Sequence, residues 1–338
     1  MGCALKEEEI RPENLFNQYL SLAEKDVQTY FKDTTFLYVP CPACRSRKTR
    51  FLFRKMGFDY EECKECETLF NNPRPKSEAF IRYYSEAPSV RFWATHFYRE
   101  TEEARRLRLI RPKAALVKTI LERYGKKKAG KDAAVADIGA GYGVFCEELQ
   151  KILSKEISVI AIEPAHDLNE ICKRKGLVTV PKFFEDVTPE DLSGKSIIAA
   201  TSFELLEHLQ DPRNFIQRCA DVLGPEALLI VTSLNWKGFD LQVLRERSKS
   251  IHPPHHINFF TPASLGMLLK SCGFTLCEIT TPGKLDVDIA GKQLSDIQDP
   301  FIKNIVSADE SVRQSFQQFL QDTRMSSHMM VVAQRNRK

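Results

Sequence analysis

The sequence has no apolar run long enough to cross a membrane, which takes roughly 18 uninterrupted apolar residues. Lys6 and three glutamates follow the first residues, where a signal peptide would place its apolar core. Charge of one sign is also scarce, because 49 basic and 45 acidic residues leave a formal net charge of only +4. Internal repeats and low-complexity tracts are missing too. These absences predict an ordinary globular, cytoplasmic protein without membrane insertion, and nothing in the composition demands a nucleic-acid partner.

Cysteine is plentiful, and four of the ten cysteines form two C-x2-C pairs. Two residues between thiolates let one tight turn direct both sulfurs at a single ion, and two such turns complete a tetrahedron. The segment between the pairs, Arg50–Glu62, has the aromatic residues of a small hairpin. A redox pair and an iron–sulfur cluster are the alternatives, but two matched pairs on a hairpin favour structural Zn²⁺. The predicted metal ligands are Cys41, Cys44, Cys63 and Cys66.

From Ala133 onward, short apolar runs alternate with helical patterns, which predicts an α/β unit with a mostly parallel sheet covered on both faces. A polar helical pattern over 284–324 precedes a last apolar run, 327–333. We interpret it as a helical insertion before a final strand, which we expect to pair antiparallel at the sheet edge. The predicted units are residues 1–85 with an N-terminal helix and zinc ribbon, 86–129 as a helical linker, 130–284 as the α/β core, and 285–338 as the insertion and edge strand.

The segment AVADIGAGYGVF, Ala134–Phe145, predicts a tight strand-to-helix turn whose glycines leave room for a ligand. The glycines are Gly139, Gly141 and Gly143, and Val144 stands where a dinucleotide fingerprint needs its last glycine. Glu163 ends the next apolar run, about 20 residues on, where a carboxylate grips ribose hydroxyls. This spacing favours S-adenosylmethionine over NAD.

With Asp137 two residues before the first glycine, the motif resembles the first signature of class I methyltransferases. The resemblance covers residues 130–281. The N-terminal pattern CPAC, CKEC, LFNNPRP and RFWATHF resembles bacterial methyltransferases with a zinc-ribbon head, some of which methylate nucleotide-activated sugars. Together, these resemblances imply a Rossmann-like methyltransferase core with a seven-stranded, mostly parallel sheet, a small N-terminal zinc ribbon, and S-adenosylmethionine as cofactor.

The resemblance also assigns candidate cofactor contacts after each strand. The turn from Asp137 to Gly143 would face the methionine part, and Asp186, preferred over Glu185, would meet the adenine amino group. The segment TSFELLEHL is similar to a V-L-E-H variant of small-molecule methyltransferases, which makes Glu204, Glu207 and His208 candidates to line the methyl-transfer cleft. The alternative is a helix whose leucines pack inward while the polar residues are merely exposed.

Three of the seven histidines lie within five positions of the long loop 233–261: His252, His255 and His256. Imidazole suits proton transfer near neutral pH, so His255 or His256 could take the proton of a methyl acceptor. A zinc site is the less favoured interpretation, because no matched acid or cysteine accompanies the histidines. HHINFFTP resembles the loop that reaches over the acceptor in methyltransferases of sugars and quinones. In the alternative, one histidine caps the Pro262 helix and another packs on Phe259.

The acceptor is predicted to be a small molecule or a glycan. The chain lacks the proline-leucine-alanine-asparagine segment of deoxysugar C-methyltransferases, so oxygen is slightly preferred over carbon. RNA is a disfavoured acceptor: a basic run could bind it, but acidic residues flank that run and no N-P-P-Y motif follows the fourth strand. A protein that binds the cofactor without turnover is the third hypothesis. The basic run comprises Arg105, Arg106, Arg108, Arg111 and Lys113.

Overall fold

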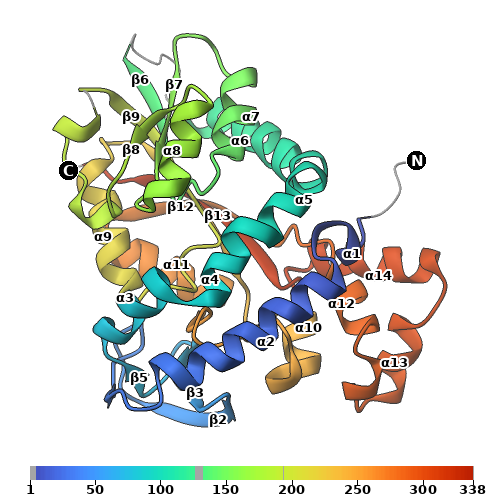
Figure 1. The fold of residues 1–338 in the computed structure, drawn as a ribbon. Coiled ribbons are helices and arrows are strands. Elements are labelled where there is room, and N and C mark those ends of the chain that lie inside the picture. The colour runs from blue at the N-terminus through green and yellow to red at the C-terminus, as the bar shows by residue number, and fades with distance from the viewer. Residues whose placement is uncertain (1–4, 126–131, 193, 338) are drawn as a thin grey trace.

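A seven-stranded sheet forms the centre of the upper half of the molecule, with helices on both faces (Figure 1). The computed structural model describes residues 5–125, 132–192 and 194–337. All strands are parallel except the one that is last in the chain. In spatial order they are β12 (Phe274–Thr280), β13 (His328–Arg335), β10 (Leu228–Leu234), β9 (Ser196–Phe203), β6 (Ala133–Ile138), β7 (Ser158–Ile162) and β8 (Val178–Val180).

Successive side chains along each strand point to opposite faces of the sheet and pack into two apolar layers. In β6, Ala134 and Ala136 belong to the cluster beneath one set of helices, and Val135 belongs to the cluster beneath the other. Both faces are therefore buried, as expected for parallel strands. The covering helices are α6 (Arg111–Tyr124), α7 (Val144–Ile152) and α8 (His166–Arg174) on one face, and α9 (Pro212–Val222) and α11 (Pro262–Ser271) on the other.

The prediction of an edge position for the last strand is wrong. β13 is antiparallel as expected, but it lies between β10 and β12, and β12 forms the edge. Residues Met329–Ala333 are buried in an unbroken run, whereas β12 is only partly buried beyond its first residue. An unbroken apolar run is typical of a strand covered on both faces, which belongs inside the sheet.

The N-terminal part packs below the core as a four-stranded antiparallel sheet with helices beside it (Figure 1). One of its strands, β11, comes from the core's long loop, more than 180 residues later in the chain. The cysteines and Phe70 share one apolar cluster with the core sheet. The elements are α1 (Glu7–Ile10), α2 (Glu13–Tyr30), β1 (Phe36–Leu37), β2 (Thr49–Lys55), β3 (Phe58–Cys63), β4 (Leu69–Asn71), β5 (Arg74–Pro75), α3 (Ser77–Glu86) and β11 (Asn258–Phe259).

A nearly continuous helical run connects this unit to the core, and it continues through Pro112. Proline removes an N–H and crowds the carbonyl four residues earlier. Here the turn just before it widens into a π-helix, which accommodates the proline as an early residue of α6. The run comprises α4 (Pro88–Phe92), η1 (Trp93–Phe97), α5 (Tyr98–Arg105), η2 (Arg106–Ile110) and α6.

The predicted helical segment before the last strand packs on α10 (Phe239–Leu244) through its own apolar cluster. It forms the right-hand side of the molecule in Figure 1. Within the described ranges, no helix combines the length and apolarity needed to cross a membrane. The remaining elements are α12 (Asp286–Gly291), α13 (Pro300–Val306), α14 (Glu310–Asp322) and the short helices η3 (Phe184–Asp186), η4 (Glu190–Leu192), η5 (Arg245–Arg247) and η6 (Leu294–Asp296).

An ion-pair network fastens the helical run to α7, and it supports a stability prediction. The Glu148 carboxylate accepts hydrogen bonds from Arg106 (2.8 Å), Arg111 (2.9 Å) and Lys151 (2.7 Å). Burial alone would raise the pKa of Glu148, but these cations lower it to about 2. The stabilisation is thus present above the unfolded pKa, about 4.3, and is lost as the pH falls toward 2.

We expect Glu148→Gln to lower the free energy of unfolding by about 1.5–3 kcal/mol at pH 7, because the charge that holds three cations is removed. The difference from the native protein should shrink as the pH falls from about 4.3 toward 2. Urea unfolding at pH 7 and at low pH measures both effects. Glu156→Gln, an exposed change just beyond the same helix, is the control. Equal destabilisation by the two variants would contradict the network's role.

Candidate functional site

The glycine turn lies at the carboxyl end of β6 and adopts a backbone that suits glycine. Gly139, Gly141 and Gly143 have φ values of +78°, +56° and +68°. A Cβ on Gly143 would lie 2.5 Å from Leu177 Cδ1 and 2.8 Å from Cys172 Sγ, so a larger residue would have to displace both side chains as well as adopt a positive φ. A Cβ on Gly141 would meet no protein atom within 4 Å. The turn therefore borders open space at its middle glycine, where a ligand can approach the backbone.

Glu163 lies against this turn, and its predicted contact with ribose stays a prediction. Its Oε2 accepts a hydrogen bond from the Gly141 N–H (2.8 Å), and its Oε1 accepts one from the Ala165 N–H (2.9 Å). Burial raises the pKa of this carboxyl group. Since a carboxylate oxygen can accept more than one hydrogen bond, Glu163 can also receive ribose hydroxyls.

The other two predicted acids differ in their surroundings. Asp137 is buried at the end of β6, where it accepts a hydrogen bond from Thr201 (2.7 Å), and burial raises its pKa to about 6. This bond ties the turn to β9. Asp186 is exposed on η3, just after β8. Its contact with adenine stays a prediction.

The segment after β9 begins with a strained residue. Glu204 has φ +51°, and its Oε1 accepts hydrogen bonds from Thr232 Oγ1 and His328 Nε2, both at 2.6 Å. Burial would raise the pKa of Glu204, but the His328 imidazole and the Lys113 ammonium bring it below its usual range. Sequence reasoning missed His328. An antiparallel strand begins at the edge of the sheet where the parallel strands end. The start of the last strand was therefore the available clue, and the first residue of β13 is His328.

Three predicted histidines from two segments meet beside this acid. His208 follows β9 and donates from Nδ1 to the His255 carbonyl (3.0 Å), whereas His256 donates from Nδ1 to the Ser250 carbonyl (2.6 Å). The ring centres of His208 and His256 are 4.9 Å apart, and those of His208 and His255 are 5.7 Å apart. The structure therefore brings all three predicted catalytic residues together at the carboxyl edge of the sheet.

Aromatic side chains from the N-terminal unit surround His255, a contact that no pattern in the sequence predicted. The Tyr83 hydroxyl lies 3.0 Å from His255 Nδ1, and Tyr84 stacks on the ring with centroids 5.6 Å apart. Tyr19 of α2 approaches it at 5.7 Å. Helical periodicity can place a tyrosine on a helix but cannot reveal what that helix packs against.

Burial sets the protonation state of the histidines. It lowers the pKa of His208 and of His252 to about 3, and it lowers the pKa of His255 and His256 as well. All four imidazoles are therefore neutral at pH 7. A neutral imidazole keeps one nitrogen lone pair, so each can accept a proton or ligate a metal ion.

The basic run is not an open cationic surface. Arg105 is enclosed by Trp93, Phe97 and Tyr98, and its Nε donates to the Ile10 carbonyl. Arg106, Arg108 and Arg111 are paired with glutamates, and Lys113 lies over the Phe203 ring, near Glu204 and Asp137.

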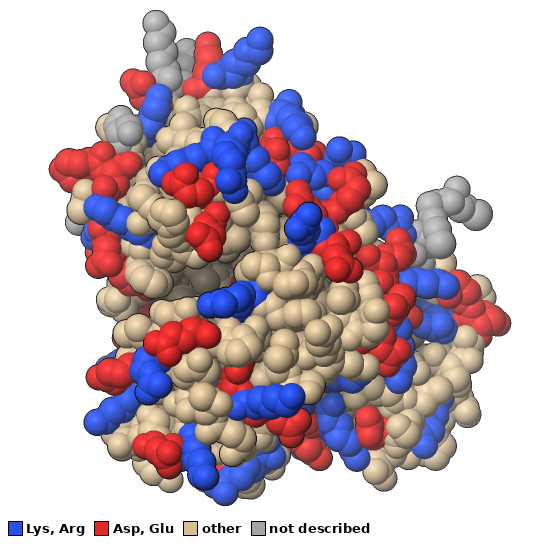
Figure 2. Space-filling view, viewed as in Figure 1, with Lys and Arg blue, Asp and Glu red and all other residues tan. Residues whose placement is uncertain are grey.

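The surface is hollowed between the upper half of the molecule and the N-terminal unit (Figure 2).

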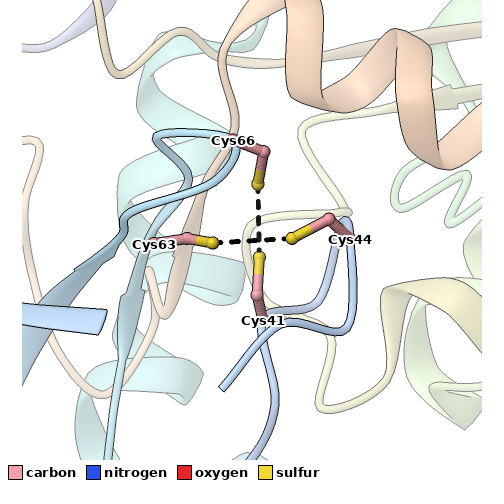
Figure 3. A group of neighbouring side chains, drawn as sticks. All are labelled: Cys41, Cys44, Cys63 and Cys66. Carbon is pink, nitrogen blue, oxygen red and sulfur yellow. Dashed lines mark hydrogen bonds between the residues drawn. The ribbon is translucent and has the colours of Figure 1, made fainter. Parts of the chain in front are cut away.

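The four predicted metal ligands converge on one point, where their sulfur atoms face one another (Figure 3). Sγ of Cys41 and Cys66 are 3.5 Å apart, as are Sγ of Cys44 and Cys63. In both turns the fifth residue donates its N–H to the carbonyl of the first cysteine (2.9 Å). Two matching turns with four thiolates are the donor set that suits tetrahedral Zn²⁺.

The cysteine unit also holds the histidine loop. β11 pairs with β4, and Tyr60 of β3 donates a hydrogen bond to the His256 carbonyl (2.7 Å). Arg74 donates to the Asn258 side chain (3.0 Å) and to the Gln210 carbonyl (2.7 Å). The two segments that carry the histidines are thus fixed by residues of the N-terminal unit.

Comparison with known proteins adds independent information. A family model described as a methyltransferase domain matches residues 104–279, slightly more than half of the chain. The chain is similar to a ubiquinone biosynthesis O-methyltransferase of Xanthomonas axonopodis pv. citri (29% identity, 50% of this chain, 74% of the relative). A protein with the same description in Xanthomonas campestris pv. campestris is 25% identical over 62% of this chain and 88% of its own. The plantazolicin methyltransferase BpumL, solved with SAH, has a similar fold (TM-score 0.50, 15% identity, 76% of this chain, 93% of that chain).

Proposed function

Since this chain belongs to the S-adenosylmethionine-dependent methyltransferases of class I, we propose that it methylates a hydroxyl oxygen of a small-molecule or sugar acceptor. The observation that carries this proposal is the meeting of His208, His255 and His256 beside the carboxyl edge of the sheet. Ligands of open α/β sheets bind at this edge. Methyl donor and acceptor would then lie next to each other.

The cofactor would lie along the turn that follows β6. Gly141 offers its backbone and Glu163 its carboxylate, whereas Asp137 supports the turn from below. Asp186 would approach the adenine, and Glu204 would line the methionine end. The bound sulfonium supplies an activated methyl group, so the protein has mainly to bind, to orient and to exclude water.

The acceptor would enter between the histidine loop and the tyrosines of the N-terminal unit. Tyr19 and Tyr84 offer ring faces, and the histidine nitrogens offer hydrogen-bond acceptors for a hydroxyl proton. Oxygen is preferred as acceptor atom because two relatives are described as O-methyltransferases. RNA is a weaker candidate, because the basic run is buried or paired with glutamates.

We further propose that Zn²⁺ is bound by Cys41, Cys44, Cys63 and Cys66 in a structural role. Four thiolates leave no position for a substrate. The ion would fix the hairpin whose strands and side chains hold the histidine loop.

The test is transfer of a labelled methyl group from S-adenosylmethionine to a metabolite extract, together with calorimetric titration of the cofactor. Labelling of a small hydroxylated compound supports the proposal. Labelling of RNA alone, or cofactor binding without any transfer, would contradict it.

The histidines allow a more specific prediction. We expect His255→Ala and His256→Ala each to slow methyl transfer by roughly 10- to 100-fold, because each removes an acceptor contact or a proton acceptor. Cofactor affinity should stay within about twofold, since neither ring belongs to the glycine turn. His166→Ala, on the exposed start of α8, is the control. Full activity in both loop variants would show that the loop does not contact the acceptor.

A further inference from the structure

The chain contains a second group of metal-ligating side chains, separate from the cysteines. One ligand atom from each of Glu207, His208 and His256 lies within 4.8 Å of the other two. Sequence spacing disfavoured a metal at the histidine loop because no acid accompanied it there. The structure supplies that acid from another segment, 49 positions earlier in the chain. We propose that these three residues bind a divalent transition-metal ion such as Zn²⁺ at the methyl-acceptor site.

The hydrogen bonds of the two imidazoles prepare them as ligands. A backbone carbonyl only accepts, so the contacts of His208 Nδ1 and His256 Nδ1 with carbonyl oxygens place the proton on Nδ1 in both rings. Each Nε2 then carries the free lone pair. Metal-binding histidines have this arrangement, in which the second ring nitrogen donates to a carbonyl and fixes the ring.

Glu207 is oriented in the same way. Ser233 Oγ donates to its Oε2 (2.9 Å), and the carboxyl group of Glu204 lies beside it. Its side chain is buried, and within the described part of the chain it forms no ion pair with lysine or arginine. A buried carboxylate is costly without a compensating cation, and a divalent ion would compensate it.

The backbone fixes the distance between the two segments. The Glu207 carbonyl accepts hydrogen bonds from the N–H groups of Ile257 (2.8 Å) and Asn258 (3.2 Å). The Asn258 side chain donates to the Leu206 and Leu209 carbonyls. Ligand atoms on one tetrahedral ion lie roughly 3.4 Å apart with bonds of about 2.1 Å. A movement of about one ångström at the side-chain ends therefore brings the three groups onto one ion.

The donor set indicates the kind of ion and its role. Two imidazoles and one carboxylate suit Zn²⁺ and similar transition metals better than Mg²⁺ or Ca²⁺, and they leave coordination positions open. A cation there would lower the pKa of an acceptor hydroxyl. His208 and His256 would then act as ligands and not as proton acceptors. The hydroxyl would lose its proton to water, its oxygen would attack the methyl carbon, and the carbon–sulfur bond would break to release S-adenosylhomocysteine. This role rests on the proposed function, whereas the existence of the site does not.

Metal analysis of the full-length protein tests the site without any assay of transfer. After equilibration with Zn²⁺ and removal of free metal, the native chain should hold one more equivalent than His256→Gln or Glu207→Gln. His252→Gln, in the same loop but outside the group, should match the native chain. With Co²⁺, the native spectrum should contain weak bands of nitrogen and oxygen ligation beside the intense thiolate bands, and both ligand variants should lack the weak bands.

Equal metal content and equal spectra in the native and variant chains would overturn the site. Calorimetry with S-adenosylmethionine on the same samples reports whether each variant is folded and binds cofactor. A chain that holds the additional metal but never transfers a methyl group would support the site and overturn the proposed function. A chain that transfers methyl groups without the additional metal would support the proposed function and overturn the site.

Discussion

Replacement of Gly141 by asparagine is expected to abolish measurable binding of S-adenosylmethionine. The side chain would fill the space beside the turn, which holds no protein atom within 4 Å of an added Cβ. Asparagine tolerates a positive φ better than other residues with a Cβ, so the variant adds bulk with little backbone strain. We expect the dissociation constant to rise by roughly 100-fold or more, which corresponds to about 2.7 kcal/mol. Calorimetric titration of the cofactor measures it.

Gly57→Asn is the matched control for this variant. Gly57 has φ +83° at the tip of the β2–β3 hairpin, and an added Cβ there also meets nothing within 4 Å. Both variants therefore share the same side chain and a similar backbone, and only one borders the proposed cofactor site. Thermal unfolding of each should resemble that of the native chain. Equal cofactor affinity in the two variants would mean that the turn does not contact the cofactor.

The parts of the fold that could be predicted are those governed by short-range patterns. Ala133–Ile138, Ser158–Ile162 and Phe274–Thr280 are strands in the part of the chain where short apolar runs predicted them, because apolar runs bounded by turn residues define their own ends. The position of the last strand was wrong, since order within a sheet depends on contacts between distant segments.

The candidate site also has one part that could be predicted from the sequence and one part that could not. The glycine turn, Glu163 and the four cysteines could be predicted, because their spacing along the chain alone brings the atoms together. The partners of the histidines could not. Glu207 and His256 are 49 positions apart, His328 lies 124 positions from Glu204, and Tyr84 reaches His255 from helix α3 of the N-terminal unit. These contacts join segments that are distant in the chain, so the spacing of residues cannot reveal them.

The same contacts predict a large effect of the cysteine centre on catalysis. Cys66→Ser should weaken metal binding at the four thiolates and loosen the hairpin that carries Tyr60 and β4. The histidine loop would then lose its support. Because a displacement of about 1 Å can cost roughly 100-fold in rate, we expect methyl transfer to fall by at least that factor. Cofactor affinity should change by less than about twofold, since Gly141 and Glu163 belong to the core sheet.

Separate measurement of transfer and of cofactor affinity distinguishes this effect from general unfolding. Cys277→Ser, a partly exposed cysteine of β12, is the control, and it should leave both quantities unchanged. If Cys66→Ser lost cofactor binding and transfer together, the cysteine centre would be needed for the whole fold, because its sulfurs share an apolar cluster with the core sheet. If it lost neither, the hairpin would hold the loop without metal.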